Sequence, residues 1–212
     1  MKKIAYTTLL LCIVNLSIFA KEYYNENYIQ VKKPVMNNYG TEFRMGTAIN
    51  PSGSTLQANS TGLLLDGQPV IPVMGEFHYS RFPDTEWRKE LLKMKAGGIN
   101  IIASYIFWIH HEEMEGKYNW EGRRNLRKFI ELCRELNLPF VLRIGPWCHG
   151  EVRNGGLPEW LVNSGVKLRS NNDAYLEKVH TWFTQLYSQL QGLMWKDGGP
   201  IIAVQIENEY GG

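Results

Sequence analysis

The chain has 212 residues, of which 44% are hydrophobic and 12% aromatic, and its formal charge is +2. Apolar and aromatic residues are spread along the whole sequence, which excludes collagen-like and disordered chains. The 23 basic residues nearly balance the 21 acidic ones, which argues against a nucleic-acid-binding protein. The length predicts one domain or slightly more.

The first twenty residues predict a secretory signal peptide. A positive head, Met1-Lys2-Lys3, precedes an apolar stretch that ends at Phe19, and Ala20 offers a small residue for cleavage. A membrane anchor is the alternative, but the strongest apolar run is about half of the ~20 residues that a span needs. We therefore expect an exported protein, periplasmic or extracellular, or in a lysosomal-type compartment of a eukaryote, with no membrane segment after cleavage. Without Lys2 and Lys3, basic and acidic residues number 21 each.

Residues 21–62 are polar and rich in Asn, Tyr and Gly, and they predict a loop-like lead-in. The stretch 63–70 predicts a hairpin, because Asp66-Gly67 is a turn signal between apolar residues.

Cys133 fits a core position in a helix. The export context would permit a disulfide between Cys133 and Cys148, although two cysteines define no framework.

Beyond the hairpin, apolar runs alternate with helical patterns. Strands are expected at 71–78, 99–108, 139–147 and 200–209, and helices at 85–96, 123–136 and 173–194. In the second helix Leu126, Phe129, Ile130, Cys133 and Leu136 recur at three- and four-residue spacing. Gly97-Gly98 is a stop signal for the first helix. Near-continuous apolar strands between amphipathic helices indicate an α/β protein with a covered parallel sheet.

Each predicted strand ends in a cluster of polar and aromatic residues, which favours a (β/α)8 TIM barrel over a doubly wound sheet. In a barrel the carboxyl ends of all strands converge on the face that holds the active site. A nucleotide-binding sheet would carry a glycine-rich turn after its first strand, and neither G-x-G-x-x-G nor a Walker loop occurs. Only about four of eight β/α units are present, so residues 63–212 are expected to form the N-terminal half of a barrel.

The fourth strand contains the pattern Gln205-x-Glu207-x-Glu209. On an ideal strand these side chains share one face, with neighbours about 6.6 Å apart. Paired carboxylates in a concave aromatic site are the equipment of glycoside hydrolysis, one as proton donor and one as base or nucleophile. The alternative is a Glu207 that packs inside the fold against a basic neighbour.

Histidines near the strand ends raise a metal site as an alternative. His78, His110, His111 and His149 all lie near predicted strand ends, and Glu112, Glu113 and Glu151 are available there as further ligands. No H-E-x-x-H occurs, and the adjacent His110 and His111 would diverge on an extended backbone. We therefore expect no metal and assign these histidines to hydrogen bonding.

Five long segments resemble glycoside hydrolase family 35, the β-galactosidases. They are GEFHYSRFP at 75–83, LKMKAGGIN at 92–100, YIFW at 105–108 with His111-Glu112, RIGPWCHGEVRNGGLP at 143–158 and GGPIIAVQIENEYG at 198–211. The resemblance implies a retaining hydrolase on a (β/α)8 barrel that removes terminal non-reducing β-D-galactose without a cofactor. Its partner is then a galactoside or oligosaccharide.

The resemblance also implies roles for single residues. The Asn-Glu pair of the family matches Asn208-Glu209, which makes Glu209 the general acid/base and Asn208 a ligand of the sugar's 2-hydroxyl. Tyr105 and Glu151 match residues that bind the sugar, while Glu207 becomes a supporting residue. Trp108 or Trp147 is expected to wall the pocket. The nucleophile of the family lies on its seventh strand, which corresponds to a position beyond Gly212.

This chain departs from the commoner family pattern after the third strand. His149-Gly150-Glu151-Val152 stands where that pattern reads Cys-Ala-Glu-Trp, and Arg153 follows, so the resemblance leaves the leaving-group side open and a related exo-β-glycoside is the alternative substrate. A non-catalytic carbohydrate-binding protein or an inactive fragment is the competing hypothesis, and the half-barrel alone is expected to be inactive.

Overall fold

The computed structural model describes residues 46–60 and 62–210, which belong to one structural unit. The predicted signal peptide at 1–20 and most of the predicted lead-in lie outside the described residues. Among the helices of these two ranges, none is long and apolar enough to cross a membrane.

A small antiparallel sheet of three strands comes first: β1 (Leu56–Asn59), β2 (Gly62–Leu65) and β3 (Gln68–Val70). The predicted hairpin is confirmed, and Asp66 and Gly67 both adopt positive φ, 51° and 73°, as a tight type I′ turn requires. The expectation of a loop through residue 62 was wrong at β1. The four residues of β1, Leu56-Gln57-Ala58-Asn59, are too few for their alternation to stand out from a polar segment, and their strand is stabilised by its pairing with β2.

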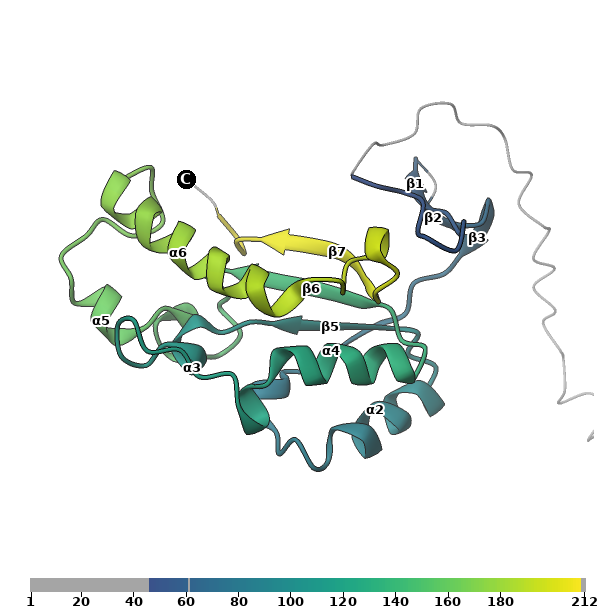
Figure 1. Ribbon diagram of the computed structural model, residues 1–212, viewed down its shortest axis with the longest axis horizontal. Helices are drawn as coiled ribbons and strands as arrows, with labels where there is room; N and C mark the ends of the chain where they lie inside the picture. The colour runs from purple at the N-terminus through teal and green to yellow at the C-terminus, as the bar shows by residue number, and fades with distance from the viewer. Residues whose placement is uncertain (1–45, 61, 211–212) are drawn as a thin grey trace, which may run out of the picture. The chain divides into compact units, whose positions relative to one another are not determined.

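The main sheet has four parallel strands in chain order: β4 (Met74–Glu76), β5 (Ile101–Tyr105), β6 (Phe140–Gly145) and β7 (Ile201–Ile206) (Figure 1). All four predicted strands are present, each shorter than its apolar run. The register pairs Tyr105 with Arg143 and Arg143 with Gln205. These three side chains are therefore level at the carboxyl ends of their strands.

Three longer helices connect the strands: α2 (Trp87–Ala96), α4 (Leu126–Glu135) and α6 (Asp173–Leu190). Asn125 and Asn172 cap α4 and α6, since each side chain accepts a hydrogen bond from a first-turn N–H, at 2.9 and 3.1 Å. The predicted stop after α2 is confirmed, because Gly98 follows it with φ +92°. The helices contact one another in chain order along the sheet (Figure 1).

Short helical segments lie between these elements. The α-helical ones are α3 (Trp108–His111) and α5 (Glu159–Val162), and the 3₁₀ turns are η1 (Tyr79–Arg81), η2 (Gly122–Arg124), η3 (Arg153–Gly156) and η4 (Trp195–Asp197). The predicted second strand therefore ends earlier than expected, and Trp108, His110 and His111 lie on α3 instead.

Large aromatic side chains fill the core between sheet and helices. Trp87, Trp108 and Trp182 are almost completely buried, and Trp108 stacks on Trp182 with ring centroids 5.4 Å apart. The predicted apolar face of α4 is confirmed, with Leu126, Phe129, Ile130 and Cys133 fully buried. Burial also raises the pKa of the Cys133 thiol to about 12. Much of the aromatic content therefore serves packing rather than a binding surface.

Candidate active site

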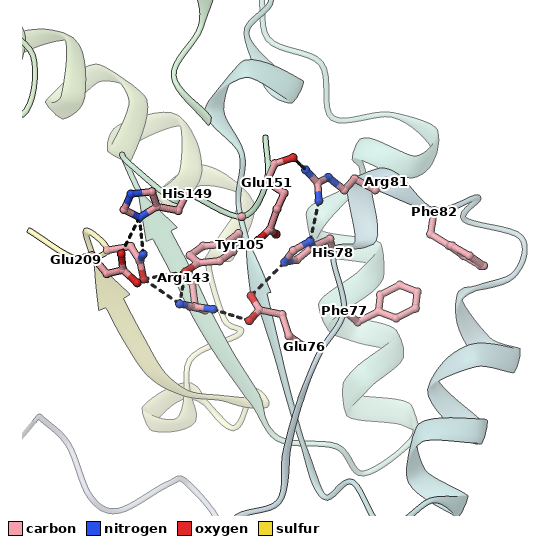
Figure 2. A pocket seen from close by; sticks show the side chains of 12 residues that line it. Glu76, Phe77, His78, Arg81, Phe82, Tyr105, Arg143, His149, Glu151 and Glu209 are labelled. Atoms are coloured by element: carbon pink, nitrogen blue, oxygen red, sulfur yellow. Dashed lines mark hydrogen bonds and ion pairs between the residues drawn. The ribbon is translucent and has the colours of Figure 1, made fainter. Parts of the chain in front are cut away.

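The carboxyl ends of the four parallel strands surround a cavity of about 570 Å³, a size typical of small-ligand sites. Each strand end contributes side chains, which converge from segments far apart in the sequence (Figure 2). The residues that line the cavity are Glu76, Phe77, His78, Arg81, Phe82, Tyr105, Arg143, His149, Gly150, Glu151, Asn208 and Glu209.

Arg143 on β6 links all four strand ends (Figure 2). Its guanidinium forms an ion pair with Glu76 on β4 at 2.5 Å and donates to Gln205 Oε1 on β7 at 2.9 Å. It also donates to the hydroxyl of Tyr105 on β5 and to Asn208 Oδ1, the latter at 3.1 Å. Arg143 thus holds the strand ends in register around the cavity.

Burial and the guanidinium of Arg143 determine the ionisation of the two acidic groups beside it. Burial tends to raise the pKa of Glu76, but the hydrogen bond with His78 and the charge of Arg143 outweigh it, so the pKa lies below 4.5. Burial raises the pKa of Tyr105, against the opposing charge of Arg143. Glu76 is therefore an anion at neutral pH, and Tyr105 is a neutral hydrogen-bond donor.

Asn208 is held by an extensive hydrogen-bond network. Its Oδ1 accepts hydrogen bonds from Tyr105 Oη at 2.8 Å, from Arg143 and from Gln205 Nε2 at 3.2 Å. Its Nδ2 lies 2.9 Å from Nδ1 of His149. Tyr105 and Asn208, both predicted site residues, are therefore in direct contact although 103 positions separate them.

Glu151 and Glu209, the two predicted carboxylates, also line the cavity. Glu209 follows β7, and its side chain is 78% exposed, with Oε2 3.6 Å from His149 Nδ1. Glu151 lies on the loop after β6, where its carbonyl oxygen accepts a hydrogen bond from Arg81 at 2.7 Å. The structure thus brings Tyr105, Glu151, Asn208 and Glu209 to one cavity.

The predicted alternation of Gln205, Glu207 and Glu209 on one strand face was wrong. Strand β7 ends at Ile206, and Glu207 and Glu209 both have positive φ, 60° and 48°. Glu207 turns away from the cavity and forms an ion pair with Arg169 at 3.0 Å. Arg169 also donates to the carbonyl of Asn208 at 3.0 Å, so this ion pair stabilises the turn that presents Asn208 and Glu209.

The pair His111-Glu112 is buried and structural. His111 Nε2 accepts from the hydroxyl of Tyr79 at 2.7 Å, and its Nδ1–H donates to the carbonyl of Asn119 at 3.0 Å. Burial lowers the pKa of His111 to about 3, so the ring is neutral. Glu112 accepts from Trp108 Nε1 at 2.6 Å and from the backbone N–H of Gly116 at 2.7 Å.

The expectation that Trp108 or Trp147 walls the cavity was wrong. Neither Trp108 nor Trp147 lines the cavity, because Trp108 is 1% exposed in the core and the ring of Trp147 packs beneath the loop after β6. Within residues 46–60 and 62–210, no three His, Cys, Asp or Glu side chains form a group that could hold a metal ion. Cys133 and Cys148 are both free and buried.

Sequence reasoning missed Glu76, Arg81 and Arg143 as residues of the site. Arg143 carried a usable signal, since a charged side chain within an otherwise apolar strand requires partners. The identity of those partners depends on the strand register, which no local pattern predicts.

The cavity offers three carboxylates, two guanidinium groups, two imidazoles and an amide, beside the aromatic rings of Phe77, Phe82 and Tyr105. Such alternating donors and acceptors beside apolar rings suit a polyhydroxylated ligand. The parallel sheet with a carboxylate-lined cavity at its carboxyl ends therefore defines the class: an α/β protein with a polar ligand site at this edge of its sheet.

Solved structures of barrel glycosidases share this fold. The exo-beta-1,4-mannosidase Op5Man5 from Opitutaceae bacterium strain TAV5 aligns with a TM-score of 0.56 at 16% identity, over 81% of this chain and 28% of that one. A beta-galactosidase from the psychrophilic Marinomonas ef1 aligns with a TM-score of 0.51 at 18% identity, over 66% of this chain and 22% of that one. At these identities the likeness concerns the fold alone.

The chain belongs to glycosyl hydrolases family 35, whose sequence model matches residues 62–212. It is 44% identical over 149 residues to a beta-galactosidase of Bos taurus, covering 70% of this chain and 23% of that protein. A beta-galactosidase of Canis lupus familiaris is 41% identical over 158 residues, covering 74% of this chain and 24% of that protein. The chain thus spans about a quarter of the length of these curated relatives.

Proposed function

We propose that this chain is part of a retaining glycoside hydrolase that releases terminal non-reducing β-D-galactose from β-galactosides. The observation that carries the proposal is the Asn208-Glu209 pair, which lies at the end of the fourth parallel strand and faces the cavity with Tyr105 and Glu151. Membership of the family and the names of its relatives supply the substrate class.

Residues 63–212 form, in this proposal, the first four β/α units of a (β/α)8 barrel, after a signal peptide at 1–20 and a lead-in at 21–62. Two features support a barrel over a doubly wound sheet. The strand order β4-β5-β6-β7 follows the chain without reversal, and consecutive helices contact one another along the sheet. Both edge strands also carry exposed apolar side chains, with Met74 55% and Ile206 67% exposed.

Glu209 is the proton donor of the proposed reaction. Its protonated carboxyl group transfers a proton to the glycosidic oxygen as the bond from that oxygen to the anomeric carbon breaks. The nucleophile attacking that carbon is a second carboxylate, which the family places on its seventh strand. Glu209 then removes a proton from water, and the resulting hydroxide releases the sugar from the nucleophile with retention of configuration.

Asn208, Tyr105 and Glu151 bind the galactose hydroxyls in this proposal. The Asn208 amide is held rigidly by its network, so it binds a 2-hydroxyl with little loss of conformational entropy. Glu151 supplies a carboxylate acceptor on the loop after β6, between His149 and Arg81 (Figure 2). No cofactor takes part, because both steps are acid–base and nucleophilic displacement.

Substitution of Glu209 in the full-length protein tests the proposal. Glu209→Gln is expected to reduce lactose hydrolysis by about 10²–10⁴-fold, the usual contribution of a general acid. An aryl galactoside with an acidic phenol as leaving group needs little protonation, so its cleavage should fall less. Glu177→Gln is the matched control, since that side chain is exposed on α6 and does not line the cavity. Unchanged lactose turnover in Glu209→Gln would refute the assignment, and galactoside binding without turnover in the wild type would indicate a carbohydrate-binding protein.

A further inference from the structure

Arg169 reaches the turn after β7 from a distant part of the chain. It lies on the loop between α5 and α6, and its guanidinium is 3.0 Å from a carboxylate oxygen of Glu207. Its Nη2 also donates to the carbonyl oxygen of Asn208, at 3.0 Å, and to that of Glu209, at 3.4 Å. One side chain thus contacts three consecutive residues of the turn that carries the proposed proton donor.

The guanidinium of Arg169 is itself held in place. It lies over the ring of Trp147, 4.7 Å from the centroid, and over the ring of Tyr210, at 5.5 Å. Its Nε and Nη2 donate to the same oxygen of Glu207, at 3.2 and 3.0 Å. A planar group fixed by both ring contacts and a carboxylate is a rigid donor, which loses little freedom when it binds further acceptors.

The turn that Arg169 contacts has a strained backbone. Glu207 and Glu209 have φ of +60° and +48°, a region that is costly for residues with a Cβ atom. The N–H of Glu207 donates to the carbonyl of Gly145 at 2.7 Å, and its carbonyl accepts from Gln205 at 2.9 Å, so this end of the turn is fixed to the sheet. Arg169 donates to the next two carbonyls. It therefore holds the part of the turn beyond Glu207.

The two proposed functional residues on this turn depend on it to different degrees. The Asn208 side chain has anchors of its own, because its Oδ1 accepts hydrogen bonds from side chains on β5, β6 and β7. The Glu209 side chain is largely exposed, and its contact with His149, at 3.6 Å, is longer than a hydrogen bond. The position of the Glu209 carboxyl group is therefore determined chiefly by its backbone, which Arg169 holds.

We propose that Arg169 is a positioning residue that directs the carboxyl group of Glu209 at the glycosidic oxygen. The inference rests on the proposed function of Glu209 as the proton donor. A donor must lie within hydrogen-bond reach of the atom that it protonates, and a displacement of about 1 Å costs about 10²-fold in rate. Loss of Arg169 releases the turn beyond Glu207, so proton transfer slows, whereas the separately anchored Asn208 still binds the sugar.

The experiment compares Arg169→Met with Arg169→Lys in the full-length protein. Met keeps an apolar stem and removes every donor, whereas Lys keeps a charge opposite Glu207 without the planar fork that serves the carboxylate and two carbonyls. The measurements are kcat/KM for lactose, kcat/KM for an aryl galactoside with an acidic phenol as leaving group, and the inhibition constant of galactose. Lactose needs the proton of the acid and the aryl galactoside hardly does, so the ratio of the two kcat/KM values reports the position of Glu209.

In Arg169→Met the ratio of lactose to aryl galactoside hydrolysis is expected to fall by about 10–100-fold, and in Arg169→Lys by less, with the inhibition constant of galactose unchanged. Arg127→Met is the matched control. Arg127 likewise pairs with a glutamate, Glu131 at 3.1 Å, and donates to two carbonyls, those of Gln189 and Gln191, but these contacts are on α4 and at the end of α6. Its ratio should equal that of the wild type.

Equal losses for lactose and the aryl galactoside in Arg169→Met would show a purely structural role and would overturn the proposal. A wild-type ratio, or a loss explained by weaker inhibition by galactose, would overturn it too. If Arg169→Met does not fold, Arg169→Lys is judged by the same criteria. Glu209→Gln is measured in parallel. If it reduces lactose hydrolysis while the ratio in the Arg169 variants does not change, only the role of Arg169 fails; if its lactose hydrolysis is that of the wild type, the proposed function fails as well.

Discussion

The guanidinium of Arg143 connects the ends of all four parallel strands, so its removal tests how the site is held together. We consider Arg143→Met, which keeps the apolar stem of the side chain and deletes its five N–H donors. Tyr105 keeps its hydrogen bond to Asn208 in this variant. The Tyr105 hydroxyl loses a donor but keeps that bond, whereas Glu76 Oε2 and Gln205 Oε1 lose the side-chain donor that each has in the structure.

The size of the effect follows from these two acceptors. A hydrogen bond to a charged group contributes about 1.5–3 kcal/mol, and one to a neutral amide about 1 kcal/mol. Glu76 keeps its contact with His78 at 3.3 Å, and a third of its side chain is exposed to water. We therefore expect Arg143→Met to lower the free energy of unfolding by about 2–4 kcal/mol at neutral pH.

The pH dependence of this loss provides a second check. The pKa of Glu76 is lowered in the folded protein, so its contribution to stability is complete above about pH 4.5 and disappears as the pH falls through the folded value. The stability gap between wild type and Arg143→Met should therefore narrow below pH 4.5. Urea denaturation of the full-length protein, followed by tryptophan fluorescence at several pH values, measures both quantities. A loss below about 1 kcal/mol at pH 7, or a gap that does not change with pH, would refute the reasoning.

Two further predictions concern the scaffold beneath the cavity. Glu112→Ala leaves the buried Trp108 Nε1 and the backbone N–H of Gly116 without acceptors. We expect it to lower the free energy of unfolding by about 2–5 kcal/mol in the same denaturation assay. A loss below about 1 kcal/mol would contradict this structural role. Gly155→Ala forces a side chain onto a residue with φ +59° and places Cβ 2.5 Å from the ring of Trp147, so we expect a loss of about 2–4 kcal/mol. Gly165→Ala is the control, because Gly165 also has a positive φ, +76°, but nothing lies within 4 Å of the added Cβ. Equal losses of stability in the two alanine variants would show that steric contact with Trp147 is unimportant.

Local sequence patterns predicted the elements well because they depend on neighbours in the chain. The spacing of Leu126, Phe129, Ile130 and Cys133 identified the buried face of α4, and Asp66-Gly67 identified the hairpin turn. The long apolar runs identified four parallel strands, although their ends were placed too far along the chain. The terminal residues of each run turn into loops, where residues such as Glu207 adopt positive φ and period-two alternation stops.

The sequence by itself therefore determined the α/β class, the family and the four polar residues that were expected to share one site. Only the tertiary structure decided their partners. Register pairs Tyr105 with Arg143 and Arg143 with Gln205, and it is this long-range pairing that makes Arg143 the common donor of the site. It likewise brings His149 against Asn208 and buries Trp108 in the core. Helix and strand patterns arise from interactions a few residues apart, whereas these contacts span 38 to 62 positions and depend on how the whole sheet assembles.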